Sequence, residues 1–430
     1  MLRHGARAAC AGAWFAFLTA ALAAQKDVAL LSKFELDNGL DVYVRAYPAA
    51  PTFAAAAVVD VSISEEPEGL EGVRSLLALC LVDSARRSLK QSGIAIDAEA
   101  KLDVLLVHAT SLPAAWQQAL AAVIDAVFHA PLDVQAVENR RAAMSEMEEA
   151  ALTNAAVVAS RAGLQALYPA MQRWARANAA YRPGAAHAVR RFYQQCFLPN
   201  RVTLAVSGPV TPTEVLEAVK RAVANLLPGA PATRASLSPE PARAGTQRIN
   251  FPGADAAVWM GARAPAPDDP DYPSALVAVT LIGNGMGSQA FRRLRDELSL
   301  AYAVRAELVA SRTCPYAYLV ATCRAQDASR VAQEVNNIVA ELISNGAPQA
   351  EVERAKEFAA TQARLIEMSN LQAAAYIGIM SLLASDQPWS VSARALSTAI
   401  AAVTAGDVSR ILRNWWSQRA TIQVVGVLQG

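Results

Sequence analysis

The chain repeats itself at an offset of a little over 200 residues, and this repeat constrains the fold more than any other feature of the sequence. The β-rich run Arg201–Gly208 (RVTLAVSG) returns as Arg419–Gly426 (RATIQVVG), and each follows a helix-like segment that carries aromatic residues. A second pair of similar segments opens long helical stretches at Val137 and Val352, each after a turn that contains proline. A period of this size is that of a domain rather than of a solenoid unit. The sequence therefore predicts two copies of one domain in tandem.

The boundary between the two copies is a stretch without helical or strand periodicity. Residues 227–242 are rich in proline, alanine and serine, a composition typical of linkers. We expect a signal segment at 1–24, a first domain at 25–230, a linker at 231–245 and a second domain at 246–430. Within each copy, strands and long helices do not follow a strict β-α-β succession, which favours an α+β fold.

Local patterns place several elements. The stretch Leu40–Arg45 alternates apolar and polar side chains, as a half-buried strand does. Asn38 and Gly39 precede it, and this pair predicts a hairpin turn because both residues accept positive φ. The segments Val137–Leu152 and Gln349–Glu367 are built from strong helix formers and predict two long helices.

The first residues have the pattern of a secretion signal. A basic start precedes the apolar stretch Ala8–Leu22, and Ala21-Leu22-Ala23 is a small-residue cleavage site. We therefore expect cleavage near residues 23–24 and a periplasmic or secreted mature chain. The apolar stretch is shorter than the ~20 residues that cross a bilayer, so no stable membrane insertion is expected. The 39 basic and 38 acidic residues nearly cancel, which argues against nucleic acid as a partner.

The four cysteines that follow the signal segment are too sparse for a disulfide framework and have no C-x-x-C spacing. Cys80 and Cys196 lie among apolar residues, and we expect both to be free and buried. A bridge between Cys314 and Cys323 is possible in an oxidising compartment, and the sequence leaves this question open.

The most specific motif in the chain is Gly283–Tyr302 (GNGMGSQAFRRLRDELSLAY). Together with Leu36–Val44 (LDNGLDVYV) and the stretch from Phe192 to Gly208, it resembles the insulinase/pitrilysin (M16) family of zinc peptidases, which includes the mitochondrial processing peptidase and the bc1 core proteins. The resemblance covers nearly the whole mature chain. It implies two homologous mixed-sheet-plus-helix domains in tandem, forming half of a clamshell with a partner subunit.

Two donor side chains in this motif are candidate site residues. Arg295 is predicted about two turns into a helix, and Tyr302 follows in the next strand, so a short turn can bring both to one surface. A guanidinium and a phenol suit a peptide carbonyl, and an oxyanion still better. The resemblance assigns Arg295 and Tyr302 the family's contacts with the substrate backbone beside the scissile bond. Alternatively, Tyr302 covers a core and Arg295 pairs with Asp296, Glu297 or another acidic residue.

The motif departs from the family pattern at two positions. Gln289 stands where many members carry arginine, and Ser299 replaces a glycine, which is expected to strain the turn before Leu300. The glycine-rich run Gly283–Ser288 lacks the Lys-Ser/Thr of a phosphate-binding loop, so nucleotide binding is not expected.

The family's metal motif is missing. In His-x-x-Glu-His, two histidines on one helix face hold Zn²⁺ and the glutamate acts as base. This chain has Ser75, Ala78 and Leu79 at those positions, and none of them can bind zinc or take a proton at neutral pH. We therefore expect no metal and no cofactor in this chain, and zinc in a partner subunit.

Other residues offer no replacement for the lost motif. Three glutamates lie where the family keeps its third ligand, and we interpret them as a solvated helix face: Glu146, Glu148 and Glu149. No two of the remaining histidines lie within four residues of each other, so paired imidazoles on one helix face are excluded: His108, His129 and His187.

These observations predict the non-catalytic, substrate-binding subunit of a heterodimeric periplasmic zinc endopeptidase, inactive alone. Arg295 and Tyr302 would contact the peptide, and a subunit with His-x-x-Glu-His would supply zinc. Two alternatives remain: a catalytically silent scaffold, similar to the bc1 core proteins, and a homodimeric peptide-holding protein.

Overall fold

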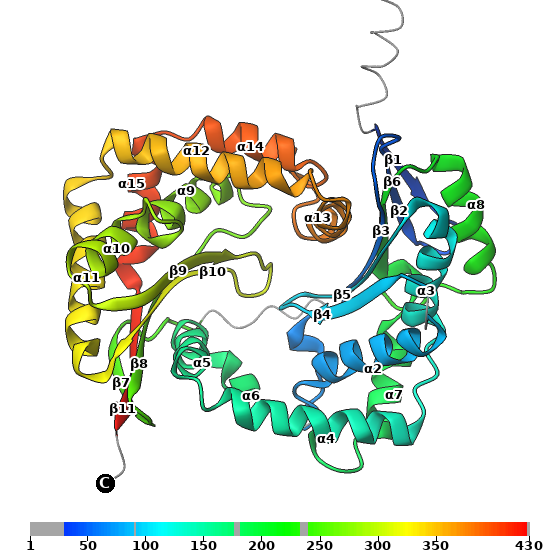
Figure 1. Cartoon of the computed structure of the whole chain (residues 1–430), viewed down its shortest axis with the longest axis horizontal. Coiled ribbons are helices and arrows are strands. Elements are labelled where there is room, and N and C mark those ends of the chain that lie inside the picture. The colour runs from blue at the N-terminus through cyan, green and yellow to red at the C-terminus, as the bar shows by residue number, and fades with distance from the viewer. Residues whose placement is uncertain (1–29, 90–91, 176–180, 233–239, 428–430) are drawn as a thin grey trace, which may run out of the picture.

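The computed structural model describes residues 30–89, 92–175, 181–232 and 240–427. Two mixed sheets, each with its own helices, lie on opposite sides of the chain (Figure 1). The first sheet consists of β1 (Leu30–Glu35), β2 (Asp41–Ala46), β3 (Phe53–Asp60), β4 (Ala95–Ala100), β5 (Val104–Ser111) and β6 (Val202–Gly208). The second consists of β7 (Gly245–Pro252), β8 (Asp255–Arg263), β9 (Ala301–Val309), β10 (Tyr316–Arg324) and β11 (Ala420–Val427).

The two sheets have the same topology. The first is ordered β1-β2-β6-β3-β5-β4 and the second β7-β11-β8-β10-β9, so the orders coincide once β1 is set aside. In the first sheet, the last strand in sequence, β6, pairs in parallel with β2, the inner strand of the edge hairpin. In the second sheet, the last strand, β11, pairs in parallel with the edge strand β7. All other neighbouring strands in the two sheets are antiparallel. The repeated runs seen in the sequence are β6 and β11. The predicted α+β fold with two homologous parts is confirmed.

Helices cover these sheets. Those of the first half are α2 (Val73–Ser88), α3 (Trp116–Phe128), α4 (Val134–Ala151), α5 (Ala155–Leu167), α6 (Gln172–Ala175), α7 (Ala186–Cys196) and α8 (Pro212–Ala222). Those of the second half are α9 (Tyr272–Gly283), α10 (Gln289–Phe291), α11 (Ala328–Asn345), α12 (Gln349–Ile366), α13 (Asn370–Leu383), α14 (Ala393–Ala401) and α15 (Ala405–Asn414). The two long predicted helices are α4 and α12. Gly39, in the predicted hairpin turn between β1 and β2, has φ +81°.

The two halves exchange one helix each. Helix α5 comes from the first half but packs on β8 and β11 of the second sheet, and α13 comes from the second half but packs on β3 and β6 of the first. A glycine permits each close approach. A Cβ atom on Gly163 would lie 2.4 Å from Cε3 of Trp259, and one on Gly378 would lie 2.6 Å from Cγ2 of Val58. Each half therefore completes the core of the other.

A buried carboxylate fastens the halves together. Asp103, in the turn between β4 and β5, is 2% exposed. Its carboxylate accepts hydrogen bonds from the Ser311 hydroxyl (2.6 Å), the Arg312 backbone N–H (2.6 Å) and the Thr313 hydroxyl, all from the second half. The Arg312 guanidinium also pairs with Asp60 at 2.8 Å. We call the contacts of Asp103 with Ser311, Arg312 and Thr313 the Asp103 anchor.

Among the described residues, no single helix is long and apolar enough to cross a bilayer. The helical segments Ala393–Ala401 and Ala405–Gln418 reach that length only as a pair, and this pair is bent by 98°. The predicted signal segment, residues 1–24, lies outside the described residues.

The four cysteines of the described chain are free and buried. This confirms the expectation for Cys80 and Cys196, and it answers the question left open for Cys314 and Cys323, which form no bridge. Burial raises the pKa of the Cys80, Cys314 and Cys323 thiols to about 12, and that of Cys196 to about 11. All four are therefore protonated at neutral pH, and a protonated thiol is a poor nucleophile.

We expect the native chain lacking residues 1–24 to react negligibly with Ellman's reagent at pH 8. The same sample unfolded in guanidinium chloride should release the signal of four thiols, because unfolding returns each pKa to its ordinary value. Absorbance at 412 nm measures both states. A count near two in the unfolded, unreduced protein would show that a disulfide forms in solution.

Candidate functional site

The residues at the lost metal motif lie in the first two turns of α2. Ala78 is buried, whereas Ser75 and Leu79 are half-buried. Ser75 lines a cavity of about 560 Å³. Tyr181 lines the same cavity, and burial raises the pKa of its phenol. The three positions together offer this cavity one hydroxyl group.

The cavity lies between the two halves of the chain. The first half contributes most of its charged and aromatic lining, including Glu66, Arg74, Glu148, Arg161, Trp174 and Tyr181. The second half contributes one end of β9 and part of α13, namely Glu307, Leu308, Val309, Ala310, Ile379 and Leu383. One wall is therefore mainly polar and the facing wall mainly aliphatic.

Glu148 points into this cavity, so the interpretation of a solvated face was wrong for this residue. Its side chain is only 14% exposed, and its carboxylate forms a two-point ion pair with Arg161, one contact being 2.9 Å long. Glu146 and Glu149 are exposed, as predicted. The partner Arg161 lies on the exchanged helix α5, which explains why the sequence of α4 gave no sign of the pair.

A second ion pair lies beneath Ser75. Glu66 and Arg74 have side chains that are each 3% exposed. Glu66 accepts hydrogen bonds from the Gly72 N–H (2.8 Å) and from Arg74 Nε (3.2 Å). Burial lowers the pKa of Arg74, and the adjacent Glu66 opposes that shift. The carboxylates near Ser75 are thus already bound to guanidinium groups.

These residues do not fit a zinc ion. Zinc sites need three or four nitrogen, sulfur or carboxylate ligands, and here the nearby carboxylates are paired with Arg74 and Arg161. Within the described ranges, no three His, Cys, Asp or Glu side chains are grouped to hold a metal. The histidines lie on separate elements: His108 in β5, His129 at the end of α3 and His187 in α7.

The Gly283–Tyr302 motif folds into a capped helix that changes its winding. The Ser288 hydroxyl accepts a hydrogen bond from the Phe291 N–H (3.4 Å) and begins α10. The helix continues as the π-helical segment η6 (Arg292–Glu297), which contains Arg295. The Leu300 N–H then donates to the Leu294 carbonyl (2.7 Å), which ties η6 to the start of β9. Short π-helical segments are rare and frequent at functional sites.

Arg295 and Tyr302 both have exposed side chains. Tyr302, on the edge strand β9, is 58% exposed. The Arg295 guanidinium lies 5.0 Å from the centre of the Phe291 ring, and no carboxylate of the described chain forms an ion pair with it. The alternative of a buried tyrosine cap and an arginine paired with Asp296 or Glu297 therefore does not hold. Both donors are available to a ligand.

The departures from the family motif have structural counterparts. Gln289 donates to Glu351 on α12 (2.7 Å), and Arg292 pairs with the same carboxylate (2.9 Å). Ser299 has φ +50°, the one positive φ among the non-glycine residues that the structure describes. This agrees with the expectation that serine strains the turn before Leu300.

Replacing Ser299 by Gly should raise the free energy of unfolding by about 0.5–1 kcal/mol. A left-handed conformation costs a non-glycine residue roughly 1–2 kcal/mol, and the greater flexibility of unfolded glycine removes part of that gain. Guanidinium unfolding followed by circular dichroism measures the change. Ser299→Ala is the control, since alanine keeps the strain. An equal effect of both substitutions would contradict the explanation.

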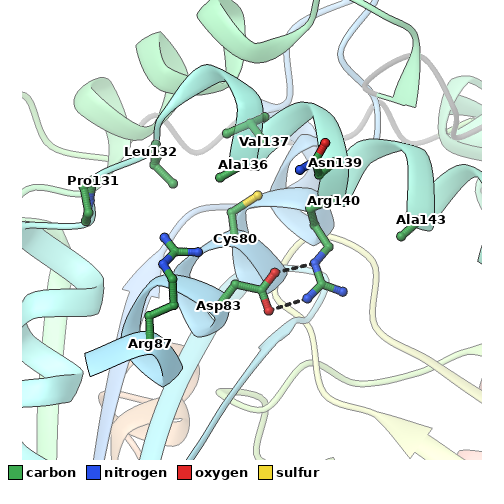
Figure 2. A pocket seen from close by; sticks show the side chains of 10 residues that line it. All are labelled: Cys80, Asp83, Arg87, Pro131, Leu132, Ala136, Val137, Asn139, Arg140 and Ala143. Atoms are coloured by element: carbon green, nitrogen blue, oxygen red, sulfur yellow. Dashed lines mark hydrogen bonds and ion pairs between the residues drawn. The ribbon is translucent and has the colours of Figure 1, made fainter. Parts of the chain in front are cut away.

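A second cavity, of about 310 Å³, lies between α2 and α4 (Figure 2). Asp83 forms a two-point ion pair with Arg140, one contact being 2.7 Å, and Arg87 lies on the other side of Cys80. Because the Cys80 thiol is protonated and Asp83 is bound to Arg140, this cavity offers no free nucleophile or base at neutral pH.

Comparison with known proteins agrees with the fold. Residues 186–358 match the family model described as the peptidase M16 inactive domain. No curated protein matches the sequence. A peptidase M16 inactive domain from Pseudomonas fluorescens is 18% identical with a TM-score of 0.78, over 93% of this chain and 99% of that one. A protease from Helicobacter pylori is 14% identical with a TM-score of 0.78, over 92% and 100% of the two chains. An M16-like peptidase from Alicyclobacillus acidocaldarius is 15% identical with a TM-score of 0.77, over 93% and 99%.

Proposed function

We propose that this chain, which belongs to the M16 peptidase family as a member of its inactive-domain type, is the non-catalytic, substrate-binding subunit of a heterodimeric zinc endopeptidase. Its partner would be an M16-type subunit that keeps His-x-x-Glu-His and holds the zinc. Export through residues 1–24 would place the complex in the periplasm.

One observation carries the proposal. Arg295 and Tyr302 are exposed, and no carboxylate of the described chain pairs with Arg295. At the cavity beside Ser75, by contrast, Glu66 and Glu148 are bound to guanidinium groups. A scaffold would not need an exposed guanidinium on η6 and an exposed phenol at the start of β9, seven residues later. The match to the inactive domain of the family supports a partnership with an active subunit.

The two donors would act on the substrate carbonyl. The guanidinium of Arg295 is a rigid fork of N–H donors, and the Tyr302 hydroxyl adds one more. Held in place by the Leu294–Leu300 hydrogen bond, they would stabilise the negative charge that develops on the carbonyl oxygen when the bond is attacked. The partner subunit would supply the attacking water and the metal.

Reconstitution tests this division of roles. The chain lacking residues 1–24, a zinc-bearing M16-type subunit from the same organism, and their mixture should each be assayed for zinc and for hydrolysis of a quenched fluorescent peptide. We expect zinc in the partner and in the mixture, and substantial hydrolysis only in the mixture. Stoichiometric zinc in this chain alone, or hydrolysis by it alone, would refute the proposal.

A further inference from the structure

We propose that the cavity beside Ser75 receives a bulky, uncharged side chain of the bound peptide, an inference that rests on the proposed function. The cavity lies where the two halves meet, a common position for ligand sites. Its volume of about 560 Å³ is within the range of roughly 300–1,000 Å³ typical of ligand pockets. It is therefore large enough for an aliphatic or aromatic side chain together with part of its backbone.

The wall from the second half favours an apolar occupant. Apart from Glu307, it consists of aliphatic residues at or just after the end of β9 and in α13: Leu308, Val309, Ala310, Ile379 and Leu383. Trp174 and Tyr181 add aromatic surface from the first half. Burying a leucine or phenylalanine against such a surface removes apolar area from water, which is favourable.

The charges around the cavity are paired, which disfavours a charged occupant. Four carboxylates of the lining have an oppositely charged partner: Glu66 with Arg74, Glu99 with Lys101, Glu148 with Arg161, and Glu307 with Arg305. The fifth, Asp103, is already occupied by the hydroxyl and N–H donors of the Asp103 anchor. An ion that entered would lose its hydration without gaining an unpaired opposite charge. We therefore expect the cavity to bind uncharged side chains more tightly than aspartate or lysine side chains.

A buried donor in the lining points to a carbonyl on the occupant. Trp174 is 9% exposed, and its indole N–H has no hydrogen-bond partner among the residues that the structure describes. The Arg173 guanidinium stacks on the indole ring, 3.9 Å from its centre, and leaves the N–H unsatisfied. Buried donors are seldom left unpaired in folded proteins. A peptide carbonyl that accompanies the side chain would supply the missing acceptor.

The distance from the proposed contact residues sets the position of this side chain in the peptide. Tyr302 and the cavity residues Glu307 and Val309 lie on the same strand, β9. At ~3.3 Å per residue, five to seven residues correspond to roughly 17–23 Å. An extended peptide held at Tyr302 would reach the cavity with a residue about five to seven positions from the scissile bond.

Peptide binding to the chain alone tests the inference. Fluorescein-labelled twelve-residue peptides of glycine and serine should carry one leucine, one phenylalanine or one aspartate, and fluorescence anisotropy gives each Kd. We expect the leucine and phenylalanine peptides to bind at least tenfold more tightly than the aspartate peptide. Equal affinities would overturn the inference.

Variants of the lining locate the effect. Ala310→Leu fills the cavity from the second half, and Ser75→Leu fills it from the first, so either should reduce the tenfold preference to less than twofold. Ala303→Leu adds the same side chain at an exposed position of β9 outside the cavity and should keep the preference. Circular dichroism melting identifies any variant that fails to fold. If either Ala310→Leu or Ser75→Leu does not fold, the peptide preference of the other variant tests the inference. A preference that survives in a folded, filled variant would overturn the inference.

The inference and the proposed function can fail separately. A leucine preference that depends on the cavity, with no hydrolysis in the reconstituted mixture, would leave the inference standing and remove the proposed function. Hydrolysis that depends on Tyr302, with no preference among the peptides, would support the proposed function and overturn the inference about the cavity.

Discussion

Replacement of Tyr302 by Phe should lower kcat of the assembled peptidase by about 10²- to 10³-fold, the usual loss when one preorganised oxyanion donor is removed. The substitution deletes only a hydroxyl group from a side chain that is 58% exposed, so the fold should be unaffected. Steady-state hydrolysis of a fluorogenic peptide measures the rate. Atomic absorption should show unchanged zinc, because the metal would belong to the partner.

Tyr47→Phe is the matched control for this experiment. Tyr47 is a half-buried tyrosine of the first half, stacked against the Arg45 guanidinium, and its loss of a hydroxyl should leave kcat within twofold. Arg295→Lys keeps the charge but loses the planar fork of donors, and it should also reduce kcat. Unchanged turnover in both Tyr302→Phe and Arg295→Lys complexes would favour the scaffold alternative instead.

Replacement of Asp103 by Ala should lower the free energy of unfolding by about 3–5 kcal/mol. The carboxylate accepts hydrogen bonds from four donor groups of the second half, and each buried donor left without an acceptor costs roughly 1–3 kcal/mol. Urea unfolding followed by circular dichroism measures the loss.

Asp97→Ala is the control for the Asp103 anchor. Asp97 lies on the neighbouring strand β4 with a side chain that is 62% exposed, and surface substitutions usually change stability by about 0.5 kcal/mol or less. Asp103→Asn should fall between the two, since an amide oxygen can still accept some of these hydrogen bonds. Similar losses for Asp97→Ala and Asp103→Ala would show that the Asp103 anchor adds little to stability.

Much of the fold could be predicted because its signals are local. The alternation in Leu40–Arg45, the turn at Asn38-Gly39 and the helix formers of α4 and α12 each act within a few residues of sequence. The repeat then indicated that the two halves share a topology, as the coincident strand orders of the two sheets confirm.

The helix exchange could not be predicted in the same way. An apolar helix face shows that a helix is covered but not which sheet covers it, and α5 and α13 are each covered by the sheet of the other half. The small residues Gly163 and Gly378 were the available signal. Isolated glycines inside helices mark close packing in many contexts, and they do not identify the partner.

The place of the candidate residues in the secondary structure could be predicted, and the contacts around them could not. The motif placed Arg295 and Tyr302 on a helix-to-strand turn, and Ser299 was recognised as a strained replacement for glycine. The π-helical winding of η6 was not foreseen. Glu148 was misassigned because its partner Arg161 arrives through the exchanged helix, a contact that no pattern within α4 records.

The exchange of α5 and α13 makes the molecule resemble a domain-swapped dimer whose two protomers happen to share one backbone. If the gene were split between α8 and β7, each product would present an apolar surface that only the other product can cover, and the two should be recovered as a single particle after co-expression. Made separately, each would be prone to aggregate. A gene fission between the halves would therefore be tolerated only if both products were made at the same time and place.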